Sequence, residues 1–181
     1  MQIFIKWAQK TPSVWKRLTI LGLGALIFPV LIPTFLIVVT TKIDQVLGVE
    51  SLLSGPIGLV IGVILIGMGG TIAMWTIVVQ FTQASGTPFP MMPTKKLITN
   101  GPFALCRNPM SLGTILAYAG LSLAIGSISS LITVALFTAL LLAYIKRIEE
   151  KELALRFGDE YVQYKAATPF LIPAVLRRTR K

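Results

Sequence analysis

The stretch Asn100 to Gly113, NGPFALCRNPMSLG, places two prolines, an arginine and polar side chains directly before a long apolar run. Proline restricts its own backbone and pushes the preceding residue toward extended conformations, so Gly101 to Asn108 is predicted to be a shaped loop rather than a helix. Asn108 is a good N-cap and Pro109 suits a first helical turn, which predicts a helix from Pro109. Free backbone donors beside the Arg107 guanidinium favour an anion. A membrane-helix start with a snorkelling arginine explains the same residues.

The composition is that of a membrane protein. The 181 residues are 54% hydrophobic and 13% charged, with a mean hydropathy of +0.78, far from the mix of a soluble globular domain. The net charge of +10 does not indicate nucleic acid, because Lys and Arg fall at the ends of apolar runs, where anionic lipid headgroups lie. We therefore expect membrane lipids, and no nucleic acid, as partners.

The single cysteine, Cys106, and the lack of histidine exclude several kinds of site. An internal disulfide, a cysteine-cluster metal site, the usual zinc sites and Ser/His or Cys/His catalysis all need residues that the chain lacks. No metal is therefore expected. Arg107 next to Cys106 can depress the thiol pKa, although a lone cysteine near a membrane is usually a small packing residue.

Four apolar segments predict an all-α polytopic membrane protein, formed as one domain by residues 1–181. The expected transmembrane helices are residues 18–39, 57–81, 109–125 and 131–147, and the last two are near the lower length limit for a span. Residues 40–56 are expected to form a polar loop. Pro29 and Pro33 should kink the first helix, which is tolerated where neighbouring helices satisfy the freed carbonyls.

Small residues repeat along three of these helices at spacings that let another backbone approach closely. The stripes are Gly58, Gly62, Gly69 and Ala73 in the second helix, Gly113, Ala117, Gly120 and Ala124 in the third, and Ala135, Ala139 and Ala143 in the fourth. We expect the third and fourth stripes to face each other, which packs these helices as an antiparallel hairpin around residues 126–130. The glycine cluster at residues 67–70 is interpreted as helix packing rather than ligand contact.

The strongly charged segment 146–181 is expected to continue the last span as an amphipathic cytoplasmic helix. Its apolar stripe is predicted to be Leu153, Phe157, Tyr161 and Tyr164. Gly158 suits a helix C′ position, Asp159 can cap a new turn, and Pro169 and Pro173 end the helix. Because 16 of the 17 Lys and Arg fall on one side of the predicted spans, both termini are expected to be cytoplasmic.

Glu149 and Glu150 follow immediately on the last span, where carboxylates are costly unless they are paired or hydrated. The predicted hairpin brings them to the same membrane face as Arg107 and Asn108. A solvated face, on which both carboxylates pair with neighbouring Lys and Arg, is the alternative.

These segments resemble the isoprenylcysteine carboxyl methyltransferase and phospholipid methyltransferase family of integral membrane enzymes. The resemblance covers residues 97–173 of a motif-bearing core, 86–173, whose Gly86 to Pro90 strap is similar to that of a prokaryotic branch with Arg-Asn-Pro. It rests on Gly101-Pro102-Phe103, Arg107, Pro109-Met110, Leu112-Gly113, Glu149-Glu150, Leu153, Phe157-Gly158, Tyr161, Tyr164 and Pro173. Many members have histidine, tyrosine and arginine where this chain has Asn108, Ser111 and Phe170.

The resemblance implies S-adenosylmethionine as methyl donor and a lipid-like or prenylated small acceptor, in a prokaryotic inner membrane. Arg107 and Asn108 would hold the amino-acid end of the cofactor, and Glu149 and Glu150 its ribose hydroxyls or ammonium. The apolar wall of the cofactor site would comprise Leu97, Ile98, Phe103 and Met110, with Gly101 and Pro109 beside them. Arg147, at the lipid level, would orient an acidic or phosphate-bearing acceptor.

Two other functions fit parts of the sequence. In the first, a non-enzymatic membrane protein, either a small transporter or an assembly partner, uses the same charged residues to bind lipid or protein. In the second, a membrane reductase uses a nicotinamide cofactor, although the chain has no phosphate-cradling glycine loop.

Overall fold

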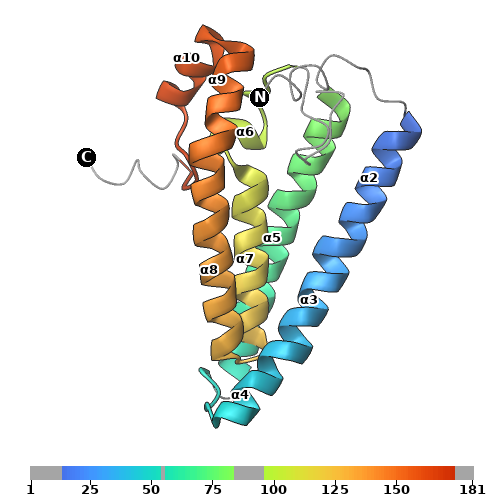
Figure 1. Ribbon diagram of the computed structural model, residues 1–181, viewed down its shortest axis with the longest axis vertical. Coiled ribbons are helices and arrows are strands. Elements are labelled where there is room, and N and C mark those ends of the chain that lie inside the picture. Colours follow the sequence, from blue (N-terminus) through green and yellow to red (C-terminus); the bar gives the residue numbers. More distant parts are fainter. Residues whose placement is uncertain (1–13, 54–55, 84–95, 174–181) are drawn as a thin grey trace. The chain divides into compact units, whose positions relative to one another are not determined.

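The computed structural model describes residues 14–53, 56–83 and 96–173, and every regular element in these ranges is a helix (Figure 1). The all-α prediction is confirmed for this part of the chain, whereas the strap at residues 86–90 lies outside it. In chain order the elements are α2 (Val14–Leu26), η1 (Ile27–Leu31), α3 (Ile32–Phe35), η2 (Leu36–Thr40), α4 (Thr41–Leu47), α5 (Pro56–Gln83), α6 (Pro102–Leu105), α7 (Pro109–Ala124), α8 (Ile128–Tyr144), η3 (Ile145–Glu149), α9 (Glu150–Phe157) and α10 (Asp159–Ala167), where η marks a π-helix.

Among the described residues, three helical runs are long and apolar enough to cross a membrane: Leu18–Leu47, Pro56–Gln83 and Ile128–Phe157. Helix α7 is apolar but has 16 residues, which gives about 24 Å at a rise of ~1.5 Å per residue, shorter than a bilayer core of ~30 Å. The helices therefore fit an integral membrane protein with three such runs, and a fourth span at α7 stays a prediction.

The first helical run ends at Leu47 rather than at residue 39, so the predicted polar loop at residues 40–56 was wrong in its first part. The hydroxyls of Thr40 and Thr41 donate to carbonyls four residues earlier. Their polar groups are thus satisfied inside the helix, which lets the helix continue. Gly48, with a φ of +65°, ends it in the left-handed conformation that favours glycine.

The π-helix Ile27–Leu31 contains the first of the two prolines that were predicted to kink this run. The N–H of Ile32 reaches back five residues in the π pattern, so the Phe28 carbonyl would need the N–H of Pro33, which has none. The hydroxyl of Tyr118 in α7 donates to the Phe28 carbonyl over 2.7 Å. A neighbouring helix therefore supplies the hydrogen-bond donor that proline cannot give to this carbonyl, as the sequence predicts.

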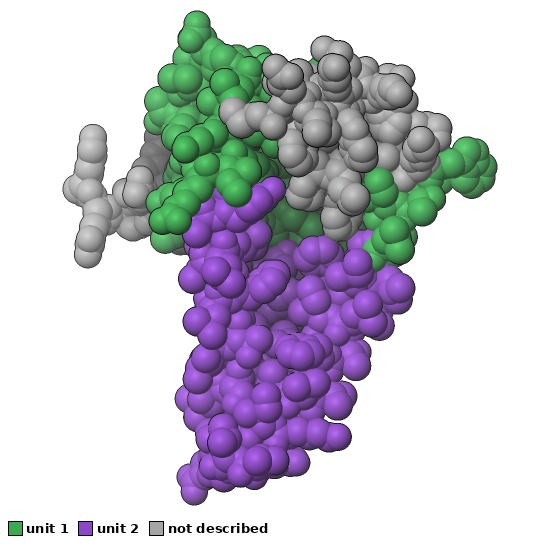
Figure 2. Space-filling model, in the orientation of Figure 1, with its two compact units in different colours: residues 1–23, 72–112, 145–181 green, residues 24–71, 113–144 purple. Residues whose placement is uncertain are grey.

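The chain divides into two compact units, each described by itself (Figure 2). Unit 1 comprises residues 1–23, 72–112 and 145–181, and unit 2 comprises residues 24–71 and 113–144. In unit 2, Leu36, Tyr118 and Val134 form a buried apolar cluster. Unit 1 contains the stretch from Asn100 to Leu112 together with the C-terminal helices, and therefore the predicted site residues.

Glycines bring α5 and α7 into backbone contact within unit 2. A Cβ on Gly62 would lie 2.5 Å from the Gly120 carbonyl oxygen, and a Cβ on Gly58 would lie 3.0 Å from the Leu123 oxygen. The predicted close approach of another backbone at Gly58 and Gly62 is therefore confirmed. The predicted partner was wrong, because the α7 stripe packs on α5 and not on α8. The α8 stripe is exposed at Ala135, Ala139 and Ala143, and alanine can face lipid without a packing partner.

A polar cluster in unit 2 joins α4 to the start of α8. Asp44 is 8% exposed and accepts hydrogen bonds from the Ser127 hydroxyl and from the Ser129 N–H. The Ser127 oxygen in turn accepts from the Ser130 N–H over 3.0 Å, as an N-cap does. Because these acceptors satisfy its first backbone donors, α8 begins at Ile128, ahead of the predicted residue 131.

The C-terminal helix is interrupted at Gly158, as the sequence predicts. Helix η3 and α9 continue α8 to Phe157, and Gly158, with a φ of +54°, separates α9 from α10. Gly158 occupies the N-cap position of α10, so the expectation that Asp159 caps the new turn was wrong, because Asp159 is already the first helical residue. Thr168 is extended and ends α10 ahead of Pro169, as expected before proline.

We predict that Gly62→Ala lowers the free energy of unfolding by about 1–3 kcal/mol, because the added methyl group must push α5 away from α7. Gly67→Ala on the same helix is the matched control, since a Cβ there meets no atom within 4 Å. The control should be neutral or more stable by about 0.5–1 kcal/mol, the helix preference of alanine over glycine. Thermal unfolding in detergent measures both, and equal melting temperatures would contradict the backbone contact.

Candidate functional site

The sequence predicted a loop from Gly101 to Asn108. This prediction was wrong in part, because the stretch contains one helical turn. Pro102–Leu105 forms α6, because proline suits a first helical position and Gly101 adopts a φ of +59° ahead of it. Helix α7 then begins at Pro109, as predicted. The Leu112 N–H bonds to the Asn108 carbonyl over 3.0 Å, so the Asn108 backbone starts this helix.

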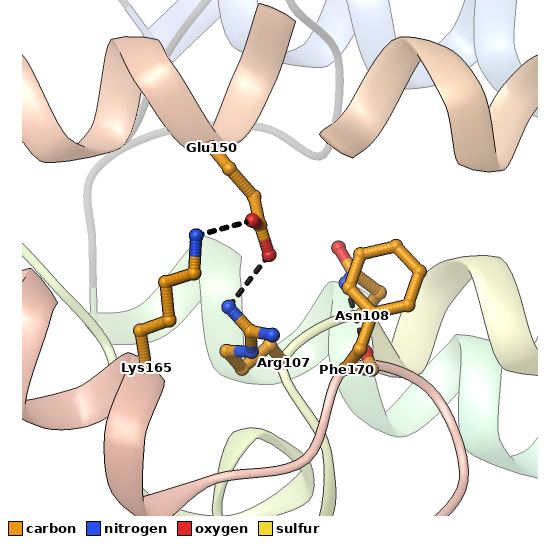
Figure 3. Close-up of polar contacts among 5 residues, drawn as sticks. All are labelled: Arg107, Asn108, Glu150, Lys165 and Phe170. Atoms are coloured by element: carbon orange, nitrogen blue, oxygen red, sulfur yellow. Dashed lines mark hydrogen bonds and ion pairs between the residues drawn. The ribbon is translucent and has the colours of Figure 1, made fainter. Parts of the chain in front are cut away.

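Three hydrogen bonds tie this stretch to residues 164–170 within unit 1. They run from Arg107 N to Pro169 O (2.9 Å), from Asn108 Nδ2 to Phe170 O (2.9 Å) and from Tyr164 Oη to Phe103 O (2.7 Å). The C-terminal segment therefore fixes the backbone around Arg107 from two directions. The Asn108 side chain holds this segment in place, since its amide donates to a backbone carbonyl (Figure 3).

The Glu150 carboxylate is shared by two cations (Figure 3). Arg107 Nη1 lies 2.6 Å from Oε1, and Lys165 Nζ lies 2.7 Å from Oε2. The side chains of Arg107 and Glu150 are 11% and 8% exposed, whereas that of Lys165 is 48% exposed. A carboxylate removed from water loses several kcal/mol of hydration, which these close cations offset. Unit 1 thus brings together Arg107 and Glu150, two predicted site residues.

Three atoms of this ion pair are sealed from solvent without a directed hydrogen bond. They are Arg107 Nε, Arg107 Nη1 and Glu150 Oε1. The 2.6 Å between Nη1 and Oε1 is an ion-pair contact whose angles are not those of a hydrogen bond. A buried polar group left unpaired costs about 1–3 kcal/mol. Buried donors and a buried acceptor therefore lie side by side, an arrangement suited to a ligand group that carries both an acceptor and a donor.

The Phe170 ring contacts two cations. Lys146 Nζ lies 5.2 Å from the ring centroid, and Arg107 Cζ lies 5.6 Å from it. Both distances are within the range of cation–π attraction. An arginine at this position, which many members of the resembled family have, would add a third positive charge, whereas the phenylalanine ring stabilises the two that are present.

Two tyrosines are buried behind the ion pair. Tyr161 is 2% exposed and Tyr164 is 9% exposed. Burial raises the pKa of both hydroxyls, and the negative charge of Glu150 raises the pKa of Tyr161 further. Both side chains are therefore neutral at physiological pH, and Tyr164 donates its hydroxyl to the Phe103 carbonyl.

The predicted apolar wall is present in part. Ile98 packs with Val79 of α5 in a buried cluster, and Phe103 packs against both. A Cβ on Gly101 would lie 3.5 Å from Val79, so Gly101 adjoins the same cluster. Outside the cluster, Pro109 is buried, and Leu97 and Met110 are part-buried.

Two other predicted residues take no part in the described ion pairs of Glu150. Arg147 is exposed and Glu149 is part-buried, and neither is a partner of Glu150 in the described ion pairs. Sequence reasoning missed Lys165, which comes from α10, beyond the helix break at Gly158. One signal in the sequence could have indicated Lys165: it directly follows Tyr164, a residue of the predicted apolar stripe.

Of the two interpretations of Cys106, the small packing residue is the one that the structure supports. The side chain is 1% exposed, and burial raises the pKa of the thiol, although the Asn108 backbone N–H lowers it in part. Desolvation of the thiolate outweighs this hydrogen bond, so Cys106 is a small packing residue.

Comparison with known proteins gives a family and one partial relative. Residues 57–160 match the family model described as phospholipid methyltransferase. The cobalt-zinc-cadmium resistance protein CzcN of Cupriavidus metallidurans is 34% identical over 77 residues, which is 42% of this chain and 35% of that protein. The match thus spans about a third of the relative's length. No solved structure matches the chain.

We predict that Cys106 reacts with iodoacetamide at pH 8 at least about tenfold more slowly in the folded protein than free cysteine does, because burial disfavours the thiolate. After unfolding in sodium dodecyl sulfate, the rate should rise to that of an ordinary thiol. Mass spectrometry of the alkylated chain measures both rates. A folded protein that reacts as fast as free cysteine contradicts the buried, raised-pKa thiol.

Glu150→Ala should lower the free energy of unfolding by about 3 kcal/mol, because it leaves the buried Arg107 guanidinium without its counter-ion. Glu152→Ala is the control, since Glu152 is 34% exposed and lies 3.4 Å from Arg156. The control should cost less than the Glu150 variant, because Glu152 keeps more contact with water and is 3.4 Å from its partner rather than 2.6 Å. Thermal unfolding of both variants in detergent gives the comparison, and similar losses would show that the Glu150 pair is not a buried one.

Proposed function

The chain belongs to the phospholipid methyltransferase family, and from this we propose that it transfers a methyl group from S-adenosylmethionine to a lipid-like or prenylated small acceptor in the membrane. The observation that carries the proposal is the buried Arg107–Glu150 ion pair, in which Arg107 Nε, Arg107 Nη1 and Glu150 Oε1 make no directed hydrogen bond. It lies in the range that matches the family. The bound cofactor supplies a methyl group activated by a positively charged sulfur.

The residues present fit the amino-acid end of this cofactor, which carries both a carboxylate and an ammonium group. The carboxylate would accept hydrogen bonds from Arg107 Nε and Nη1, and the ammonium would donate to Glu150 Oε1, so the three unbonded atoms would all gain partners. Asn108 would hold the arginine loop in position through its bond to the Phe170 carbonyl. Glu149 would reach the ribose hydroxyls.

The apolar side of the site would take the adenine and the methyl region. Ile98 and Phe103 already form a cluster with Val79, beside Gly101, and we assign Leu97, Pro109 and Met110 to the same wall. An apolar wall excludes water from the reacting atoms and strengthens the charge interactions next to it.

The proposed chemistry needs alignment more than it needs a strong acid or base. A methyl group would pass from sulfur to the acceptor in one displacement. Holding the sulfonium and the acceptor atom in line would therefore supply most of the rate acceleration. The chain has no histidine, and the two buried tyrosines are neutral. The described residues therefore bind and orient the reactants rather than move a proton.

We propose that the acceptor reaches the site laterally from the bilayer. Arg147 follows the apolar helix α8 and is exposed, as suits a residue that orients an acidic or phosphate-bearing headgroup. The uneven distribution of Lys and Arg favours a cytoplasmic position for the site and for both termini. The resemblance to a prokaryotic branch of the family is the basis for proposing a prokaryotic inner membrane.

S-adenosylhomocysteine, the product of methyl transfer, should stabilise the protein. At one hundred times its dissociation constant, the free energy of unfolding should rise by about 2.7 kcal/mol. Thermal unfolding in detergent and calorimetry measure this binding. The proposal fails if a monodisperse preparation neither shifts its melting temperature nor releases heat with this ligand.

Matched arginine variants sharpen the test. Arg107→Ala should abolish the stabilisation, whereas Arg156→Ala, which removes an arginine that pairs with Glu152, should retain it. A non-enzymatic transporter or assembly partner predicts instead that Arg107→Ala changes oligomerisation without any cofactor binding to lose. Binding of NADPH, with no response to S-adenosylhomocysteine, would favour the reductase.

A further inference from the structure

Lys165 belongs to the part of the ion-pair network that the proposed function leaves unexplained. Glu150 carries one negative charge and contacts two cations, so the trio of Arg107, Glu150 and Lys165 has one positive charge in excess (Figure 3). Two of its three side chains are about nine-tenths buried. The charge that Glu150 does not neutralise lies on the half-exposed Lys165, beside the buried Arg107, and this favours an anion at the trio.

We propose that Lys165 is a cofactor-binding residue that, together with Arg107, binds the carboxylate of the amino-acid end of S-adenosylmethionine. This inference rests on the proposed function and assigns a role to a residue outside the range that matches the family, 57–160. The carboxylate neutralises the excess charge and accepts from the Arg107 donors, whereas Glu150 Oε1 remains for the ammonium.

Lys165 can bind the carboxylate without leaving Glu150. Its ammonium has three N–H donors, and the described ion pair with Glu150 Oε2 at 2.7 Å uses one of them. The side chain is 48% exposed, so the other donors are within reach of an incoming group. Two cations that converge on one carboxylate form charge-assisted hydrogen bonds, which are about twice as strong as neutral ones.

The backbone that carries Lys165 is anchored on both sides. The preceding residue, Tyr164, donates its hydroxyl to the Phe103 carbonyl. On the other side, the carbonyl of Pro169 accepts from the Arg107 N–H. These bonds join α10 to the loop that carries Arg107. The two cations are therefore held as one receptor rather than meeting by chance in solvent.

The charge of the trio also selects which part of the cofactor lies against Lys165. An ammonium group there would be repelled by Lys165, and a ribose hydroxyl would leave the positive charge unneutralised. A carboxylate satisfies both the charge and the donors. The sulfur and adenosine parts, which carry no anion, should not sense Lys165.

The test compares two ligands that differ in one group, S-adenosylhomocysteine and its decarboxylated analogue, which keeps the ammonium. Calorimetry with the full chain in detergent should show that Lys165→Gln weakens binding of S-adenosylhomocysteine by at least about tenfold, the loss expected for one charge-assisted bond. Binding of the decarboxylated analogue should change by less than about twofold. Lys165→Arg, which keeps the charge, should stay within about threefold of the unmodified protein for both ligands.

Lys151→Gln is the matched control, because it removes one exposed positive charge from the neighbouring helix α9 and should leave both affinities unchanged. The inference is overturned if Lys165→Gln binds S-adenosylhomocysteine as tightly as before or more tightly. It is also overturned if Lys165→Gln weakens both ligands equally, which would show that Lys165 only positions Glu150. If the unmodified protein binds neither ligand, the proposed function itself fails and the inference falls with it.

Discussion

The buried carboxylate of Glu150 is the constraint on which the candidate site depends. A charge that is 92% removed from solvent persists only with close counter-ions, and here these come from two separate segments of unit 1, the loop before α7 and helix α10. Each counter-ion in turn fixes the segment that carries it. One side chain near the end of the long helical run Ile128–Phe157 thereby contacts both the loop before α7 and helix α10.

Three hydrogen bonds to backbone carbonyls hold the same segments together as the ion pair does. The Arg107 N–H and the Asn108 side chain both bond to the segment after α10, and Tyr164 bonds to α6. This arrangement bears on the replacement of the family's usual histidine. At this position an amide that donates to a carbonyl can do what a histidine donor would do, so the bond to Phe170 gives Asn108 a positioning role that needs no proton transfer.

The sequence predicted those features that depend on local chemistry. The start of α7 at Pro109, the break at Gly158 and the end of α10 before Pro169 each follow from the conformations that proline and glycine prefer. The end of the first helix was missed although Gly48 marks it, because the polar residues before Gly48 suggested a loop. In the structure, hydrogen bonds to Ser127 and Ser129 satisfy Asp44, and this contact across the chain is absent from any local pattern.

The local sequence pattern did not determine which helix packs against the small residues of α7. The small residues of α7 fit either neighbour, and nothing in their spacing distinguishes α5 from α8. The distinction comes from the neighbouring helix: Gly62 of α5 lets α7 approach to backbone contact, whereas the alanines of α8 are exposed. The same limit applies to Lys165. Lys146 and Lys151 are closer to Glu150 in the sequence, yet Lys165 is the lysine that pairs with it in the described residues. This pairing depends on the turn at Gly158, which brings α10 back toward the carboxylate.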